Sequence, residues 1–366
     1  MYRVNEIIDE LRAYDSEREW FEFKENWFQA DGLGEYISAL SNSAAIAGKR
    51  YAVIPAAKTV PISYARERYI RVGSSKENLR KYPEKESFLF DILRHGFPTM
   101  ENTPSVYQEL TFEKLLIYYG AKGLKLNPDT FKKNLSFFTE DGKYNILAQL
   151  LSDNSHMPIR VAIFSGTSKA DNMYSVREFG NQCLLYSLDE VLRYGDVLNI
   201  IQADERERVV ERREVPLFQN DAFREAVINA FVHNKWVSGN EPMITVFSDR
   251  IEILSRGSLA PEQTMEGFFA EESVPVNKKL SEILLQLHIS EKTGRGVPKI
   301  TQRYGREAYE FRENSIVVRI PFNWINVMGD KGKSEDNSLT NTQIRKNNFF
   351  TDNRIIQILT GRLLHE

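Results

Sequence analysis

The spacing of apolar and polar residues along the chain predicts a mixture of helices and strands. Apolar residues recur three and four positions apart, the period of a half-buried helix, in residues 33–47, 87–94, 111–119, 144–151, 184–204 and 278–287. Short apolar runs bounded by turn residues predict strands at 51–55, 69–72, 159–164, 208–215, 243–247, 251–254 and 315–321. The first residues add a helix at 4–11 and a strand at 20–27. This order of elements indicates an α+β protein.

Two polar stretches divide the chain into parts. Residues 98–104 (PTMENTP) contain two prolines and an Asn-Thr pair, which mark a linker, and residues 329–341 are rich in glycine, lysine and serine. The length of 366 residues suits two or three domains. We expect an N-terminal module, a mixed α/β middle region, a C-terminal α/β sandwich and a linker with a tail that begins to resemble a winged helix, at residues 1–100, 105–215, 216–325 and 326–366.

Composition narrows the class of protein. Hydrophobic residues make up 42% and charged residues 27%, which is ordinary for a folded protein with a sizeable core. The net charge of −3 implies that any surface for nucleic acid is local. Cys183 is the only cysteine, which excludes an intrachain disulfide and a cysteine-based zinc site. The first residues lack the apolar core of a signal peptide, and no run of about 18 apolar residues occurs. We therefore expect a cytoplasmic protein without a membrane partner.

One predicted helix carries three polar residues at steps of four. In REAVINAFVHNKW, residues 224–236, these are Glu225, Asn229 and His233. We expect Asn220 or Asp221 to cap this helix. Four residues advance a helix by about 400°, so the three side chains share one face. The face is either a solvated stripe on an amphipathic helix or a surface turned toward a ligand.

Two glycine-containing loops follow this helix. After a predicted hairpin comes SRGSL, residues 255–259, and after the helix at 278–287 comes EKTGRGVPKI, residues 291–300. Glycines at the junction of a loop and a helix let the backbone approach a phosphate closely. A single G-x-G is usually only a turn, but a polar helix face followed by two such loops is more specific for a nucleotide.

The region from Phe223 to Ile300 resembles the Bergerat-fold (GHKL) ATP-binding domain. It is most similar to the divergent form attached to Schlafen-like AlbA domains in bacterial proteins. That form carries E-x-x-x-N-A-x-x-H, then D-R-I-E-I with a glycine turn, then E-K-x-G-x-G. The matching residues here are Glu225, Asn229, Ala230, His233, Asp249 to Ile253, Gly257, Glu291, Lys292, Gly294 and Gly296.

This resemblance implies ATP and Mg²⁺ as cofactors and gives residues their expected roles. Asn229 would hold Mg²⁺ against the phosphates, and Glu225 would activate water if ATP is hydrolysed. His233 would contact phosphate or ribose, with a capping or core histidine as the alternative. The nucleotide site as a whole is expected to include Asn229, His233, Asp249, Ser255, Gly257, Gly294 and Gly296. Ser255 stands where the well-known ATPases have an aspartate that binds the adenine amino group, and a hydroxyl is a less selective acceptor.

The N-terminal part resembles the Schlafen-like AlbA domain, whose families bind DNA or RNA. The matching segments are Glu17, Glu22-Phe23-Lys24, YISALSNSAAIAG at 36–48 and YIRVGSS at 69–75. The family places a hairpin and further strands after the helix that ends near Gly48. Here only Lys49 and Arg50 precede the next strand, so we expect a reduced module.

A basic segment in this module supports a nucleic-acid partner. Residues 66–85 contain seven basic and three acidic residues, with interleaved tyrosines that could stack on bases. The expected phosphate contacts are Arg66, Arg68, Arg71, Lys76, Arg80 and Lys81. The alternative is a solvated basic loop near a domain edge.

The combined resemblances favour a nucleotide-responsive regulator, such as a transcription regulator, that binds DNA or RNA as a homodimer. One alternative is a metal-dependent nuclease in anti-phage defence that uses Glu17, Glu22 and Lys24. Metal-assisted cleavage needs several carboxylates around the cation, and the strand that should supply the third is the one missing after Gly48, so we expect no nuclease activity. The other alternative is a scaffold whose ATP site has decayed.

Overall fold

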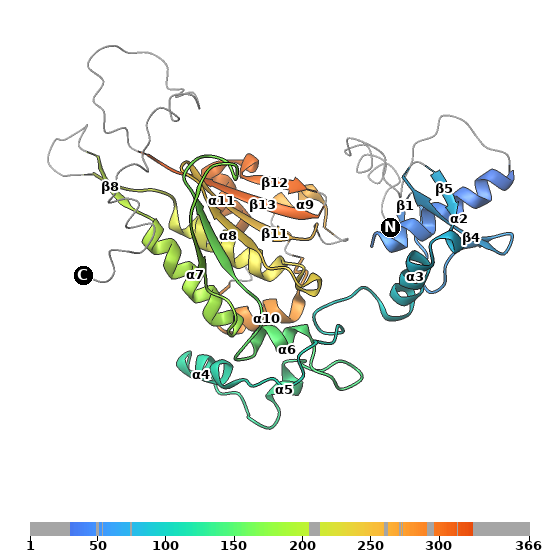
Figure 1. Cartoon of the computed structure of the whole chain (residues 1–366), viewed down its shortest axis with the longest axis horizontal. Coiled ribbons are helices and arrows are strands. Elements are labelled where there is room, and N and C mark those ends of the chain that lie inside the picture. The colour runs from blue at the N-terminus through green and yellow to red at the C-terminus, as the bar shows by residue number, and fades with distance from the viewer. Residues whose placement is uncertain are drawn as a thin grey trace, which may run out of the picture. The chain divides into compact units, whose positions relative to one another are not determined.

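The computed structural model divides into two compact units, Met1–Pro98 and Thr99–Glu366 (Figure 1). It describes residues 30–48, 51–52, 54–73, 75–204, 213–259, 263–270, 272, 274–290, 296–312 and 314–324. The helix expected at 4–11, the strand expected at 20–27 and the tail at 326–366 lie outside these residues. The predicted α+β class is confirmed: helices pack against a mixed six-stranded sheet in the second unit. No described helix is long and apolar enough to span a bilayer.

In the part of the first unit that the structure describes, two helices pack with small sheets. Its helices are α2 (Ala30–Ile46) and α3 (Pro83–His95). Its strands are β1 (Tyr51–Ala52), β2 (Ile54–Pro55), β3 (Ser63–Tyr64), β4 (Glu67–Val72) and β5 (Ser75–Asn78), with the 3-10 turn η1 (Leu79–Lys81) leading into α3. Strands β3, β4 and β5 form an antiparallel sheet, and β1 pairs with β2. Ile70, Leu79, Leu89 and Ile92 form its core with the alanines of α2.

A buried polar seam joins α2 to the strands. The Asn42 amide donates to the carbonyls of Ile62 at 2.8 Å and Tyr69 at 3.0 Å, and its oxygen accepts from the Ile62 N–H at 2.7 Å. Ser43 Oγ accepts from the Arg71 N–H at 2.8 Å. The small polar residues of the SNS run therefore satisfy strand backbone groups at positions where an apolar side chain could not.

The second unit begins with three short helices: α4 (Glu113–Ala121), α5 (Phe131–Asn134) and α6 (Ile146–Leu151). Phe112, Phe131 and Phe137 pack ring against ring between them, with centroid separations of 5.0 to 6.2 Å. Asn145 begins α6 as its N-cap and accepts from the Ala148 N–H at 3.0 Å. This group continues into one large hydrophobic core that spans most of the unit.

A six-stranded sheet organises the rest of the unit. Its order is β12-β13-β11-β10-β6-β7, and only the pair of β6 and β10 is parallel. The strands are β6 (Arg160–Phe164), β7 (Met173–Glu178), β10 (Met243–Val246), β11 (Arg250–Arg256), β12 (Tyr309–Arg312) and β13 (Ser315–Pro321). Because β6 pairs with β10, the ranges expected as separate domains, 105–215 and 216–325, share one sheet and one core.

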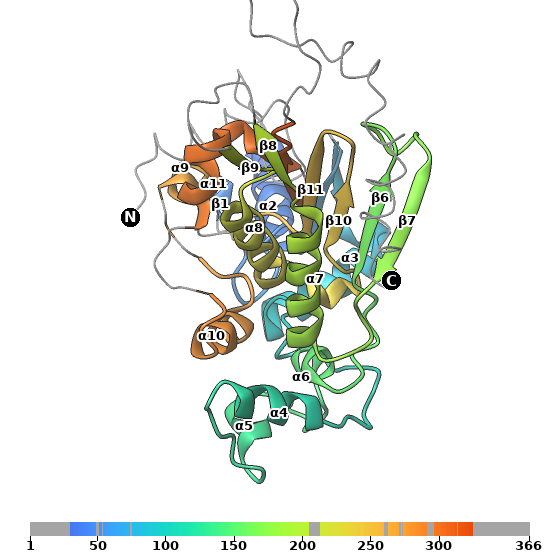
Figure 2. The ribbon, with the colours of Figure 1, turned by 90° about the vertical axis from the view of Figure 1, so that its left-hand side faces the viewer.

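Helices cover this sheet around a central helix, α8 (Asn220–His233). Helix α8 contacts α7 (Leu184–Leu198), α11 (Gly296–Tyr304) and strands β11 and β13, and Figure 2 shows α7 and α8 side by side. Two further helices, α9 (Met265–Phe269) and α10 (Lys278–Gln286), lie between β11 and α11 in the chain. Small elements complete the unit: η2 (Trp236–Ser238), η3 (Arg306–Ala308), and the β8–β9 pair (Ile201–Asp204 and Arg213–Pro216).

Two sequence predictions about helix ends are wrong. The helix predicted at 184–204 ends at Leu198, since Ile201 to Asp204 pair with β9 and the Asn199 side chain accepts from the Phe218 N–H at 3.0 Å. Gln219 rather than Asn220 or Asp221 is the N-cap of α8, and it makes no side-chain capping bond. The Gln219 N–H donates to the Tyr304 hydroxyl at 2.9 Å, so in both places contacts with a distant segment accompany the boundary.

We expect Asn42→Ala to loosen the first unit. The change removes the Asn42 bonds to the Ile62 N–H and the Tyr69 carbonyl, whereas the Ile62 carbonyl keeps Ser38 Oγ as a donor at 2.7 Å, and the expected cost is about 2 to 4 kcal/mol. Hydrogen exchange followed by mass spectrometry should then be faster in peptides covering residues 62–72. Asn134→Ala is the matched control, because Asn134 is exposed on α5 and its side chain bonds to Thr130, the N-cap of the same short helix. Unchanged exchange in Asn42→Ala would show that the seam does not hold the strands.

Candidate pocket on the second unit

Helix α8 is buried on every side except one. Val227 and Phe231 are fully buried, and six further apolar residues of the helix are at most 7% exposed. The three polar residues Glu225, Asn229 and His233 are half-buried and all line one pocket. The stripe is therefore not the solvated face of an amphipathic surface helix, because both of its flanks are packed.

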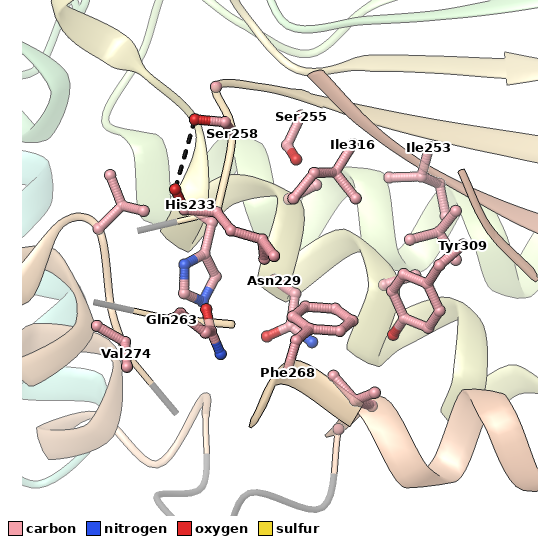
Figure 3. A pocket seen from close by; sticks show the side chains of 18 of the residues that line it. Asn229, His233, Ile253, Ser255, Ser258, Gln263, Phe268, Val274, Tyr309 and Ile316 are labelled. Carbon is pink, nitrogen blue, oxygen red and sulfur yellow. Dashed lines mark hydrogen bonds between the residues drawn. The ribbon is translucent and has the colours of Figure 1, made fainter. Parts of the chain in front are cut away.

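The pocket is bounded by α8, α9, β11, β12, β13 and the start of α11 (Figure 3). The empty space between the lining residues is about 950 Å³ when the open solvent at its mouth is included. One part of the lining is polar and another apolar. The pocket is lined by residues that include Glu225, Asn229, His233, Ile253, Ser255, Gly257, Gln263, Phe268, Glu272, Gly296, Tyr309, Ile316 and Val318.

Glu225, Asn229 and Gly296 meet at one end of the pocket. The Asn229 amide nitrogen donates to Glu225 Oε1 at 3.1 Å. A Cβ atom on Gly296 would lie 2.0 Å from the same oxygen, so the Glu225 side chain lies directly against the first residue of α11. The glycine expected to admit a phosphate thus admits a carboxylate in this structure.

His233 lies one turn beyond Asn229, and Figure 3 shows Asn229 between His233 and Tyr309. Burial lowers the pKa of the His233 imidazole from 6.5 to about 4. At neutral pH the ring is uncharged and offers one donor and one acceptor nitrogen. It therefore suits hydrogen bonds to hydroxyl or base groups better than pairing with a phosphate charge.

The end of α8 beyond His233 is held by two buried asparagines, Asn234 and Asn277. Asn277 donates to the carbonyls of Val232 at 2.7 Å and Asn234 at 2.8 Å, and Asn234 Oδ1 accepts from the Arg256 N–H at 2.9 Å. These bonds tie the end of α8 to the end of β11 and to the start of α10. Gly257 follows β11 with a φ of 110°, a conformation that favours glycine.

The apolar part of the pocket comes from residues that sequence reasoning did not single out. Phe268 of α9 packs edge to face against Tyr309 and Phe311 of β12, with centroids 5.1 and 5.2 Å apart. Burial and the nearby Glu225 carboxylate raise the pKa of the Tyr309 hydroxyl. Ile253, Ile316 and Val318 add the sheet side. The local sequence carried no signal for these aromatics, because β12 and α9 meet only through tertiary packing.

The structure brings some of the expected site residues together and not others. Glu225, Asn229, His233, Ser255, Gly257 and Gly296 share the pocket, with Ser255 only 8% exposed. Asp249 precedes β11 at the end opposite Ser255, about 20 Å away along an extended strand, and pairs with Arg250 at 2.8 Å. Gly294, Glu291 and Lys292 lie outside the described residues. The part of the pocket that the structure describes has two carboxylates and no Lys or Arg.

The basic segment of the first unit is largely paired with carboxylates. Arg71 is buried, 1% exposed, and so is not part of an exposed basic surface. Arg66 is exposed in the two-residue turn between β3 and β4, with φ of 66°, and pairs with no described carboxylate. The other cations form the pairs Arg68–Glu86 (2.9 Å), Arg80–Glu67 (3.2 Å), Lys81–Glu77 (2.9 Å) and Lys76–Glu35. Glu17, Glu22 and Lys24 lie outside the described residues.

Comparison with known proteins bears on the second unit. Residues 239–321 match the family described as "Putative ATP-dependent DNA helicase recG C-terminal". The match covers Ser255, Gly257 and Gly296 but begins after α8, and it supports the GHKL-like ATPase fold expected for the C-terminal part. A similar solved structure is that of the DIP2311 protein from Corynebacterium diphtheriae, with 13% identity and a TM-score of 0.48 over 87% of this chain and 80% of that one. No curated protein matches.

Protonation of His233 should oppose folding. The unfolded chain takes up this proton near pH 6.5 and the folded protein only near pH 4. Below pH 6.5 the unfolded state binds more protons, so stability falls as the pH is lowered through this window. We expect a loss of about 2 kcal/mol between pH 7.5 and pH 5 that is absent in His233→Gln. Urea unfolding at the two pH values measures the difference.

His288→Gln is the matched control, because His288 is exposed. It should keep the acid sensitivity of the wild type. If His233→Gln loses as much stability on acidification as the wild type, His233 is accessible to protons in the folded state and the pocket is wetter than its burial indicates.

Proposed function

We propose that the chain is a nucleotide-responsive nucleic-acid-binding regulator. In this proposal the pocket of the second unit binds an adenine nucleotide with Mg²⁺, and the first unit binds DNA or RNA. The observation that carries the nucleotide part is the convergence of Glu225, Asn229 and His233, from one face of α8, with Gly257 and Gly296 around a single pocket. The match to an ATPase-like family over residues 239–321 supports the same assignment.

The two parts of the pocket suit the two ends of a nucleotide. The aromatic and aliphatic side chains of Phe268, Tyr309 and Ile316 offer a surface for a base, and the polar end offers Asn229 and Glu225. Among the described residues no group of three or more His, Cys, Asp or Glu could hold a metal ion by itself. Oxygen ligands of this type suit Mg²⁺, which commonly binds through one or two side chains together with phosphates and water. The residues present fit a cation that arrives with the nucleotide.

Glu225 is the residue proposed to activate water if the nucleotide is hydrolysed. It lies in the pocket, and a carboxylate is a suitable general base. Its bond with Asn229 and its contact with Gly296 place the group at the polar end. Mg²⁺ bound there would neutralise phosphate charge, which the described lining, with no cationic side chain, does not do.

The nucleic-acid part rests on the exposed cations of the first unit. Arg66 stands at the tip of the β3–β4 hairpin, and Arg80 is exposed although paired with Glu67. Exposed ion pairs contribute little to stability, about 0 to 1 kcal/mol, so a phosphate can replace the carboxylate at small cost. Arg66 and Arg80 are therefore the cations that we expect to contact phosphates first.

Asn229→Ala should weaken binding of ATP in the presence of Mg²⁺ by tenfold or more, about 1.4 kcal/mol, because it removes the oxygen ligand. Isothermal titration calorimetry with ATP and Mg²⁺ measures this. Asn220→Ala is the matched control: Asn220 is in the first turn of the same helix, outside the pocket, and bonds to Asp196. Absence of Mg²⁺-dependent binding to the wild type at millimolar ATP would overturn the nucleotide assignment.

Reversing the charge of Arg66 and Arg80 together should abolish nucleic-acid binding and leave nucleotide binding unchanged. The variant is Arg66→Glu with Arg80→Glu, tested by fluorescence anisotropy with labelled single-stranded and double-stranded DNA and RNA over a range of salt. Wild-type affinity should fall steeply with salt, as expected for phosphate contacts. Lys125→Glu with Lys133→Glu makes the same charge change at exposed sites of the second unit. Equal affinity of the Arg66→Glu, Arg80→Glu variant and the wild type would place the nucleic-acid surface elsewhere.

A further inference from the structure

Glu225 determines which end of the Asn229 amide faces it. An ionised carboxylate only accepts hydrogen bonds, so the atom of Asn229 that lies 3.1 Å from Glu225 Oε1 must be the amide nitrogen. The carbonyl oxygen of Asn229 is then held on the other side of the amide.

Gly296 keeps Glu225 in this place. The Glu225 side chain crosses Gly296 so closely that an added Cβ would lie 2.0 Å from Oε1, 2.6 Å from Cδ and 2.9 Å from Cγ. Gly296 lies within a helix and does not need a positive φ, in contrast to Gly257. The glycine is required here for space: any side chain at this position would push Glu225 away from Asn229.

We propose that Glu225 is a positioning residue that fixes the Asn229 carbonyl oxygen toward the cation of the bound nucleotide, with Gly296 as the support that holds Glu225 in reach. This inference rests on the proposed nucleotide function and adds a role to Glu225 beyond any part in hydrolysis. Partners that orient metal ligands affect metal affinity strongly, by about 10- to 100-fold. The orientation should therefore appear as the Mg²⁺ dependence of nucleotide binding.

The test is the affinity for a non-hydrolysable ATP analogue, measured by calorimetry with Mg²⁺ and with EDTA. In the wild type Mg²⁺ should strengthen binding. Glu225→Gln, whose amide can donate as well as accept, should reduce this Mg²⁺ enhancement about tenfold. Gly296→Ala should do the same although both Glu225 and Asn229 remain, and the double variant should lose no more than either single one, as expected for residues that act as one unit. Because the analogue is not hydrolysed, a role of Glu225 as general base does not affect the result.

Two further variants separate orientation from charge and from folding. Glu225→Asp keeps the negative charge but is one methylene shorter, so it should lose the 3.1 Å contact and the Mg²⁺ enhancement even if Gly296→Ala does not fold. Gly120→Ala in α4 is the control for adding a methyl group to a helical glycine, because nothing lies within 4 Å of its added Cβ. It should bind like the wild type.

Three results would overturn the inference. Full Mg²⁺ enhancement in Gly296→Ala and Glu225→Asp, with loss only in Glu225→Gln, would mean that Glu225 acts through its charge. Additive losses in the double variant would mean that the two residues act independently. Wild-type binding that does not depend on Mg²⁺ would mean that no cation takes part in nucleotide binding, so that Asn229 has no cation to face. If the wild type binds no nucleotide at all, the proposed function itself fails, and this outcome is distinct from the first three.

Discussion

The burial of α8 is the constraint on which the second unit depends. The helix has apolar residues on every face but one, so it is stable only where a sheet and neighbouring helices cover those faces together. Trp236 and Asn277 extend this arrangement beyond the helix: Trp236 donates to the Phe231 carbonyl at 2.9 Å, and Asn277 holds the carbonyls at its end. Since the other faces are occupied, the remaining polar stripe must border either solvent or a cavity, and the packing of α9, β11 and α11 makes it a cavity.

Burial beside α8 changes the charge of the side chains that line this cavity. Burial keeps the His233 imidazole neutral, with a pKa of about 4, and raises the pKa of the Tyr309 hydroxyl, so neither adds charge at neutral pH. Glu225 is the carboxylate at the polar end, where Asn229 donates to it and Gly296 leaves it room. The described lining offers no positive side chain to an anion, so a phosphate group would have to bring its own cation, and this is the physical basis of the proposal that nucleotide binding needs Mg²⁺.

In the first unit, polar side chains rather than apolar ones join the main helix to the strands. Its helix α2 carries serines and an asparagine where a core helix would have apolar residues, and these side chains bond to strand backbone groups. Its basic residues lie along strands and a turn next to carboxylates, so four of them form ion pairs and Arg66 alone of the six expected contacts is exposed without a described carboxylate partner. The density of positive charge in the sequence therefore overstates the charge that this surface presents.

The sequence by itself determined the local features of the chain. The spacing of Glu225, Asn229 and His233 placed them on one helix face because the helical period depends only on neighbouring residues. Most helices and strands, and with them the α+β class, followed in the same way. Tertiary structure alone decided that Asp249 lies far from Ser255, that Arg71 is buried, that α7 ends at Leu198 and that Gly296 serves to admit Glu225. It also supplied Phe268 and Tyr309. These outcomes depend on strand register and on contacts between segments distant in the chain, which the periodicity of a single segment does not contain.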